Sequence, residues 1–187
     1  MTGFRVSFTR MDAGTTADYR RLGETARVEH DGLAETVLGA LVGLRGFNPG
    51  YAIDRYRHSL QTATRALRDG ADDELISVAL LHDIGDLLAP ENHSAYAAAV
   101  LRPYVSDENH WLVLHHGVFQ GYYYFHHFGR DRDAREAFRG HPAFEKTAAF
   151  CENWDQRSFD PDYDTLPLDA FEPRVRRLFA TPRESFV

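Results

Sequence analysis

The sequence predicts an all-α fold, arranged as a single compact helical bundle. Apolar residues recur at helical spacing along most of the chain, and prolines, glycines and helix-capping residues divide it into segments of typical helix length. The chain has 187 residues, 43% of them hydrophobic, which suffices to bury one sizeable core. We therefore expect one structural domain, in which residues 1–50 form an N-terminal arm and helices that pack on a core formed by residues 51–187.

The first half of the chain is expected to hold an arm followed by helices. Residues 4–9 alternate apolar and polar side chains, which predicts either a short strand or an extended arm on the surface. The glycines and proline of residues 46–50 end the first helical region in a loop. Apolar spacing and polar caps predict helices within residues 15–44, over residues 53–68, and from Asp72 or Asp73, either of which could cap the helix, to near His82.

The second half is expected to hold three further helices, each of which carries a candidate metal ligand. An aromatic stretch over residues 121–125 leads from the second of them into a segment rich in arginine and aspartate. The first helix begins at Pro90 and carries His93, and the second follows Ser106 and carries the pair His115-His116. The third follows Pro142 and leads to Asp155.

The composition argues against several classes of partner. A formal charge of −7 and an isoelectric point near 5.8 disfavour nucleic acids and anionic membranes, which both attract concentrated positive charge. A single cysteine, Cys151, excludes an intrachain disulfide, and the longest apolar runs are too short to cross a bilayer. No N-terminal run has the pattern of a secretory signal. We expect a cytoplasmic protein, monomeric or a small homo-oligomer, whose partner is a small molecule.

Histidine and aspartate residues give the clearest functional signal. Imidazole and carboxylate ligands without thiolate suit iron, manganese or zinc, whereas many histidines argue against magnesium or calcium. Because consecutive helical positions point about 100° apart, the doublet His82-Asp83 can serve one site only near a helix end that faces a shared cavity. From there Asp83 can bridge two ions. The candidate ligands for two adjacent ions are His58, His82, Asp83, His93, His116 and Asp155.

These residues resemble the signature of a known superfamily. His58, the doublet His82-Asp83 and Asp155 look like the H…HD…D pattern of the HD-domain superfamily. The intervening His93 and His116 resemble the additional ligands of its dinuclear members. The resemblance covers about residues 51–179 and implies an HD-domain helical bundle with a dinuclear metal site in its centre.

A narrower resemblance concerns the sequence around the ligands. The segments His58–Ala63 and Leu80–Gly85 look like those of the mixed-valent di-iron oxygenases, of the myo-inositol oxygenase and 2-amino-1-hydroxyethylphosphonate oxygenase type. This resemblance implies two iron ions, Fe(II) and Fe(III), that use O2 to oxidise or oxidatively cleave a small hydroxylated substrate. Such a substrate could be an organophosphonate, a polyol or an amino alcohol.

The resemblance also assigns individual roles. It implies one iron on His58, His82, Asp83 and Asp155, and the other on His93, His116 and the bridging Asp83, with His115 as the alternative to His116. His82 and Asp83 are then the central catalytic residues.

Substrate contacts are expected at four positions, two of which depart from the family pattern. The acid Asp86 and the neutral Gln120 replace positively charged contacts found in relatives, which disfavours a phosphonate in the same pose. Tyr51 and Asp54 resemble a gating tyrosine and an acidic substrate contact, and the alternative is a turn with a packing tyrosine. Arg55 and Arg57 are either anion contacts or solvated surface residues. The expected substrate-binding residues are Tyr51, Asp54, Asp86 and Gln120.

Two other functions use the same ligands. In a phosphohydrolase of this superfamily, a pair of manganese or zinc ions would activate water to attack a phosphate ester. The absence of clustered lysine and arginine around the doublet argues against phosphate binding. A noncatalytic metal-stabilised module would be expected to have a closed ligand shell, whereas six ligands for two ions leave coordination positions open.

Overall fold

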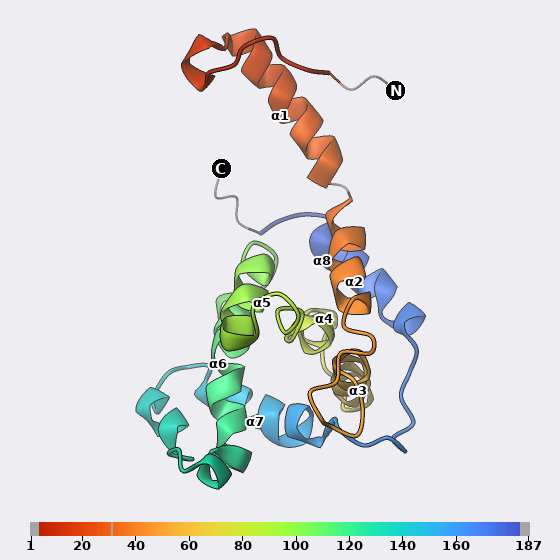
Figure 1. Ribbon diagram of the computed structural model, residues 1–187, viewed down its shortest axis with the longest axis vertical. Coiled ribbons are helices and arrows are strands. Elements are labelled where there is room, and N and C mark those ends of the chain that lie inside the picture. The colour runs from red at the N-terminus through yellow and green to blue at the C-terminus, as the bar shows by residue number, and fades with distance from the viewer. Residues whose placement is uncertain (1–3, 31, 184–187) are drawn as a thin grey trace.

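The computed structural model describes residues 4–30 and 32–183, which form α-helices and short 3₁₀ helices but no strand. This all-helical architecture confirms the predicted class (Figure 1). The α-helices are α1 (Thr16–His30), α2 (Leu33–Val42), α3 (Arg55–Arg68), α4 (Asp73–Leu81), α5 (His93–Leu101), α6 (Asp107–Tyr124), α7 (Phe144–Asn153) and α8 (Glu172–Phe179). The 3₁₀ helices are η1 (Met11–Ala13), η2 (Pro90–Asn92), η3 (Phe125–Phe128), η4 (Ala134–Phe138), η5 (Asp155–Arg157) and η6 (Leu168–Ala170).

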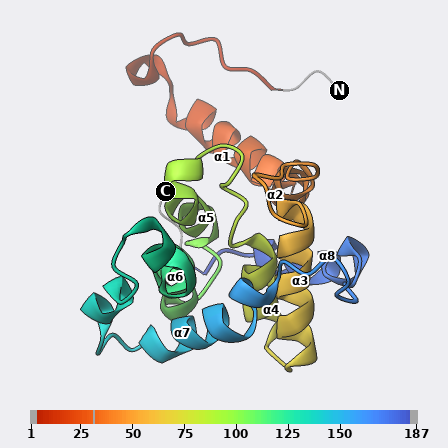
Figure 2. The same cartoon turned by 60° about the horizontal axis from the view of Figure 1, so that its bottom comes forward.

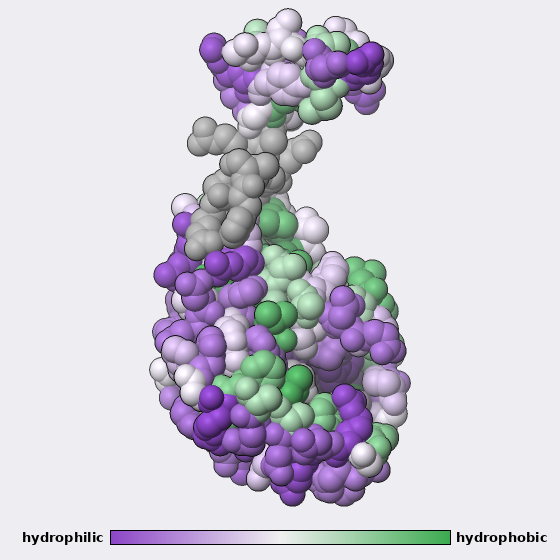
Figure 3. Space-filling model, turned by 90° about the vertical axis from the view of Figure 1, so that its left-hand side faces the viewer, coloured by the Kyte–Doolittle hydropathy of each residue, from purple (hydrophilic) through white to green (hydrophobic). Residues whose placement is uncertain are grey.

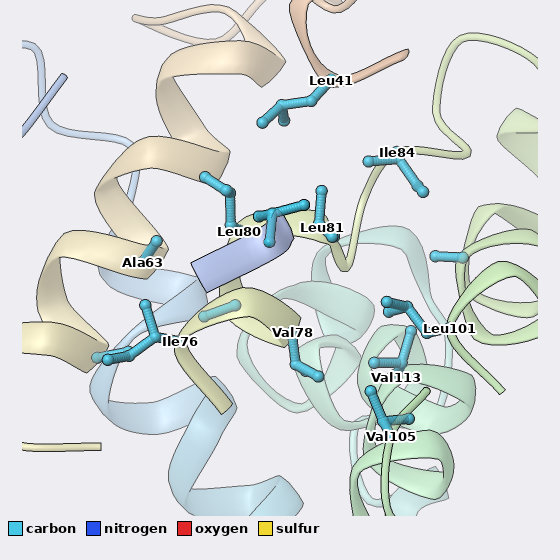
Figure 4. Close-up of a cluster of buried hydrophobic side chains, with 14 of the residues drawn as sticks. Leu41, Ala63, Ile76, Val78, Leu80, Leu81, Ile84, Leu101, Val105 and Val113 are labelled. Carbon is cyan, nitrogen blue, oxygen red and sulfur yellow. The ribbon is translucent and has the colours of Figure 1, made fainter. Parts of the chain in front are cut away.

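Helix α4 lies in the centre of the bundle. All its residues from Ile76 to Leu81 are buried, and it contacts α3, α6 and α8. A helix that is buried on all sides needs neighbours on all sides. Figure 4 shows these neighbours, with Leu41 and Leu101 among the side chains that surround Leu80 and Leu81. Because α4 is enclosed, the doublet that follows its last residue lies inside the molecule.

Polar caps fix where the two central helices begin. The Asp54 side chain accepts a hydrogen bond from the Arg57 backbone N–H at 2.8 Å and caps α3. Asp72 accepts one from the Leu75 N–H at 2.8 Å and caps α4, so Asp72 rather than Asp73 is the N-cap. Such caps satisfy backbone donors that have no partner within the helix.

The chain after α7 returns to run along α3. The Gln61 amide donates to the Asp160 carbonyl at 2.5 Å, and the Arg65 guanidinium donates to the Arg157 carbonyl at 2.9 Å. Further along, the Leu166 N–H donates to the Thr64 hydroxyl at 3.2 Å. These bonds fix the position of η5, which carries Asp155. The chain then reaches α8, which contacts both α2 and α4.

The N-terminal region divides into two parts. Helix α2 contributes Val37, Leu38 and Leu41 to the core and contacts α8. Helix α1 projects away from the body formed by the later helices, as Figures 1 and 2 show. Residues 4–9 have no regular secondary structure, which corresponds to the extended alternative. This arm folds back on α1, where the Phe8 and Tyr19 rings lie 5.6 Å apart.

The surface of the body is mixed in character. Figure 3 shows many of the hydrophobic residues gathered along the middle of the face turned to the viewer, with hydrophilic residues on either side. No helix within the described residues is both long and apolar enough to cross a membrane.

Candidate metal centre

The four predicted histidines and two predicted aspartates meet in the middle of the bundle. Three groups of these side chains, one of which includes Asp86, have ligand atoms within 4.8 Å of one another and could hold metal ions. The ligands come from five places in the chain. His58 is in α3, His82 and Asp83 follow α4, His93 begins α5, His116 is in α6, and Asp155 begins η5.

The first group consists of His58, His82 and Asp155, all of them fully or almost fully buried. The Nε2 atoms of His58 and His82 are 3.2 Å apart. The Asp155 Oδ1 atom lies 3.3 Å from the Nε2 atom of His58 and 3.6 Å from that of His82. Three potential ligand atoms therefore surround one point.

Asp83 connects this group to a second pair of histidines. Its Oδ2 atom lies 3.2 Å from the Nε2 atoms of both His58 and His82. Its other oxygen, Oδ1, lies 3.1 Å from Nε2 of His116 and 3.5 Å from Nε2 of His93. The two oxygens of one carboxylate thus face different histidine pairs, which is the arrangement that a bridging ligand requires.

The histidine rings are oriented as metal ligands. The other ring nitrogen, Nδ1, lies 2.9 Å from the Ser158 carbonyl in His58, 2.9 Å from the Ala79 carbonyl in His82, and 2.7 Å from the Val113 carbonyl in His116. A carbonyl only accepts hydrogen bonds, so each Nδ1 carries a proton and each Nε2 atom faces inward, where it can bind a metal ion.

Lone pairs that face each other at this distance need a cation between them. Unprotonated Nε2 atoms of His58 and His82 at their separation of 3.2 Å would repel each other unless a proton or metal ion lay close to both. The residues therefore fit bound metal ions, with imidazoles and carboxylates as the ligands.

Electrostatics in the cluster also favour positive charge. Burial lowers the pKa of His82, but the carboxylates of Asp83 and Asp155 outweigh it and raise this pKa to about 10. Burial opposes ionisation of Asp155, yet hydrogen bonds from His58 and His82 hold its pKa below the ordinary value. The carboxylates are therefore ionised and attract a cation.

Arg55 and Asp86 form a charged layer around the ligands. The Arg55 Nη2 atom lies 2.5 Å from Asp83 Oδ2, and the Arg55 Nε atom donates to Asp86. The other Asp86 oxygen lies 3.5 Å from Nδ1 of His93. Burial raises the pKa of Asp86, as does the charge of Asp83, while Arg55 opposes this rise.

A cavity of about 390 Å³ opens next to the second histidine pair. Asp83, His93, His116 and Asp155 line it, whereas His58 and His82 lie behind them. Much of the remaining wall is aromatic. Its aromatic residues are Tyr51, Tyr123, Tyr124, Phe128 and Phe159.

The structure places the four predicted substrate contacts differently. Tyr51 and Gln120 line the cavity, and Gln120 donates to Asp155 Oδ1 at 3.0 Å. Asp54 caps α3 instead, and it also accepts a hydrogen bond from the Gly46 N–H at 2.9 Å. Asp86 does not line the cavity, because its carboxylate is paired with Arg55.

Two further pairs of alternatives occupy different positions. His116 lies within the cluster, whereas the His115 ring stacks on Trp111 with 4.1 Å between ring centroids. Arg57 donates to the Pro161 carbonyl and lies on the surface. Arg55 lies in the cavity wall, with only 13% of its side chain exposed.

Sequence reasoning missed one neighbour of the site and gave Arg55 no definite role. The Phe159 ring stacks on His58, 4.4 Å between centroids, and Tyr51 packs against Phe159 at 4.7 Å. No sequence pattern marked Phe159, because it lies in an irregular segment far from His58 in the chain. The position of Arg55 could have been predicted from the sequence, since it precedes His58 by three residues and therefore lies on the same helix face.

Comparison with models of known protein families found no match, and comparison with curated proteins found none either. The resemblance to the HD-domain superfamily accordingly rests on the ligand pattern alone.

Proposed function

We propose that this protein is a di-iron oxygenase of the HD-domain type, which uses O2 to oxidise or oxidatively cleave a small hydroxylated substrate. The observation that carries the proposal is the split carboxylate of Asp83, whose two oxygens face two separate histidine pairs. Four imidazoles and two carboxylates form a ligand set suited to iron. The choice of an oxygenase within this ligand class is supported by the sequence resemblance around His58 and His82.

The ligands divide into an inner and an outer group. His58, His82 and Asp155 would hold one ion, and of these three only Asp155 lines the cavity. His93 and His116 would hold the other ion at the cavity wall, with Asp83 shared between the two groups. Bound there, a pair of iron ions would supply the activation of dioxygen. Because the outer group lines the cavity, a substrate in the cavity would meet that group first.

The other cavity residues would bind and orient the substrate. The aromatic wall offers apolar surface, which excludes water and positions carbon–hydrogen bonds near the ligands. Gln120 offers a neutral polar contact beside Asp155. Its hydrogen bond to Asp155 also holds that ligand in place.

Charge in the cavity favours this function over phosphate-ester hydrolysis by manganese or zinc. Among the described residues, Arg55 is the only lysine or arginine that lines the cavity. Its guanidinium already pairs with two carboxylates, those of Asp83 and Asp86. A phosphohydrolase needs cationic or hydrogen-bonding groups to stabilise developing phosphate charge. In this cavity the one arginine among the described lining residues is already paired with carboxylates.

Metal analysis and oxygen uptake test the proposal. We expect protein produced in iron-rich medium to contain close to two irons, and partial oxidation to give the magnetic signal of a coupled Fe(II)/Fe(III) pair. Polyols, amino alcohols and hydroxyphosphonates are then screened with an oxygen electrode. Asp83→Ala should lose both irons and all oxygen uptake, because Asp83 contacts both groups.

The matched control is Asp54→Ala, which removes a carboxylate outside the cluster and should keep both irons. A fully active protein that contains one zinc ion would contradict the proposal. So would rapid anaerobic hydrolysis of phosphate esters without oxygen uptake on any hydroxylated compound.

A further inference from the structure

Arg55 contacts the carboxylate shared by the two ligand groups. Its Nη2 atom lies 2.5 Å from Asp83 Oδ2, the oxygen that also faces His58 and His82. The side chains of Arg55 and Asp83 are 13% and 2% exposed. A charge-assisted hydrogen bond this well shielded from solvent is strongly directional, so it restrains the rotation of the Asp83 carboxylate.

Asp86 holds the guanidinium in this position. The Arg55 Nε atom donates to Asp86 Oδ2, and this second contact prevents the guanidinium from swinging into the cavity. The other oxygen of Asp86 lies 3.5 Å from Nδ1 of His93. A chain of alternating charges, from Asp83 through Arg55 to Asp86, therefore connects the bridging carboxylate to a ligand of the outer group.

Helix geometry explains why this arrangement arises. Arg55 is the first residue of α3, directly after the Asp54 cap, and His58 follows three residues later on the same face. Asp86 follows Asp83 by three residues in the turns after α4, where the Asp86 N–H donates to the Asp83 carbonyl at 3.0 Å. The two short segments place two acids beside one arginine.

We infer that Arg55 is a positioning residue for the metal pair: its two-pronged contact with Asp83 and Asp86 keeps one Asp83 oxygen on the inner group and the other on the outer group. The inference rests on the proposed two-metal function. This positioning role requires the planar, forked guanidinium of arginine, because a lysine ammonium is a point charge that cannot match both contacts in this geometry. Arg55 does not serve as a receptor for anionic substrates, since its charge is already balanced.

The outer ion should depend on Arg55 more than the inner one. The inner group keeps His58, His82 and Asp155 when the Asp83 carboxylate rotates, whereas the outer group is left with His93 and His116. Loss of such a supporting partner lowers metal affinity by roughly ten- to hundredfold.

The test uses Mn(II) as the probe, because it does not oxidise readily and its magnetic resonance spectrum distinguishes coupled pairs from single ions. Metal-free Arg55→Lys protein is titrated beside wild type. Wild type should bind two Mn(II) ions and give the spectrum of a coupled pair. In Arg55→Lys, the second ion should bind roughly ten- to hundredfold more weakly, and the six-line spectrum of a single ion should appear.

Arg57→Lys is the matched control, because it makes the same substitution two residues along α3, at a side chain that donates to the Pro161 carbonyl, away from the ligands. It should behave as wild type. Asp86→Ala is a second variant. It removes the second contact of the Arg55 guanidinium, and it should therefore weaken binding of the outer ion, as Arg55→Lys does. Circular dichroism confirms that each variant is folded.

The outcomes separate the inference from the function on which it rests. If Arg55→Lys binds a coupled pair as tightly as wild type, Arg55 is only a counter-charge and the inference is wrong. The inference is also wrong if Arg55→Lys is unfolded and Asp86→Ala retains wild-type binding and coupling. If wild type itself forms no coupled pair with Mn(II) or with iron, the proposed function fails and the inference fails with it.

Discussion

Glu74 is a single carboxylate that joins two helices. It lies in the first turn of α4, and its Oε1 atom accepts hydrogen bonds from the Ser106 N–H at 2.7 Å and the Asn109 amide at 2.6 Å, at the start of α6. Its Oε2 atom pairs with Arg183 at 2.9 Å. Burial raises the pKa of Glu74, but these partners outweigh it, and the pKa lies below its ordinary value of 4.5.

This pKa shift predicts how stability depends on pH. Because the folded pKa is lowered, the ionised Glu74 stabilises the folded state above pH 4.5, and this contribution is lost as the pH falls through the folded pKa. We expect Glu74→Gln to lower the free energy of unfolding of the metal-free protein at pH 7. Urea denaturation should show that the difference from wild type shrinks below pH 4.5.

A matched control lies nearby. Glu108→Gln changes an exposed carboxylate of α6 that is 3.5 Å from Lys146, and exposed pairs contribute little to stability. It should change the free energy of unfolding much less than Glu74→Gln does. A difference for Glu74→Gln that stays constant from pH 7 to acid would contradict the assignment.

At this scale, the sequence predicted residue types better than their partners. All six residues of the proposed ligand set could be picked out from the sequence, and they do lie together in the structure, because their chemistry is rare and their spacing is informative. Asp54 and Asp86 were expected to contact substrate, but the first caps a helix and the second pairs with Arg55. An isolated acid in a sequence does not reveal which backbone donor or arginine will reach it after folding.

At the scale of elements, Gly85 controls how the turn after α4 packs on the start of α5. A Cβ atom placed on Gly85 would lie 2.6 Å from the His93 carbonyl oxygen and 2.8 Å from its Cα atom. Both neighbours are backbone atoms, which cannot give way as a flexible side chain could. The turn and the helix can therefore approach this closely only if residue 85 is glycine.

We therefore expect Gly85→Ala to displace His93 and to weaken binding of the outer ion of the proposed metal pair. The number of tightly bound metal ions should fall from two towards one, as measured by metal analysis after dialysis. Gly39→Ala is the control, because Gly39 lies inside α2 where an added Cβ would meet open space, and alanine there should stabilise the protein by about 1 kcal/mol. Unchanged metal content in Gly85→Ala would contradict the prediction.

Helix positions were largely predictable and helix arrangement was not. Capping and apolar spacing placed α3 and α4 close to their observed limits and gave the start of α6 after Ser106, since these signals act within a few residues. The continuation of α6 through Tyr124 was missed, because its aromatic run has no helical apolar stripe. The projection of α1 from the body was also not foreseen. Local sequence signals show where a helix forms, but they do not show which other helices it contacts.

For the whole molecule, the proposed metal pair couples binding to folding. The six ligands come together only in the folded state, and an ion that binds only this state stabilises it by mass action. At a free metal concentration about 100 times the dissociation constant, the gain is about 2.7 kcal/mol. The midpoint of thermal unfolding should therefore rise with the concentration of added iron or manganese.

Two neighbouring histidines provide a matched test of this coupling. His116→Ala removes a proposed ligand and should reduce the metal-dependent rise in midpoint, whereas His115→Ala removes a ring stacked on Trp111 and should leave that rise intact. Differential scanning calorimetry with and without metal measures both. Equal rises in the two variants would show that the added metal binds elsewhere.

The wide separation of the ligands along the chain has a consequence for biosynthesis. His58 and Ser158, whose carbonyl orients the His58 ring, are 100 residues apart. At a synthesis rate of about 5–20 residues per second, roughly 5–20 seconds separate the appearance of these two residues on the ribosome. During that interval the nascent chain presents His58 and the doublet without Asp155 or its supporting segment. Loading of the proposed metal pair must therefore follow the synthesis of residue 155, when all six proposed ligands are available.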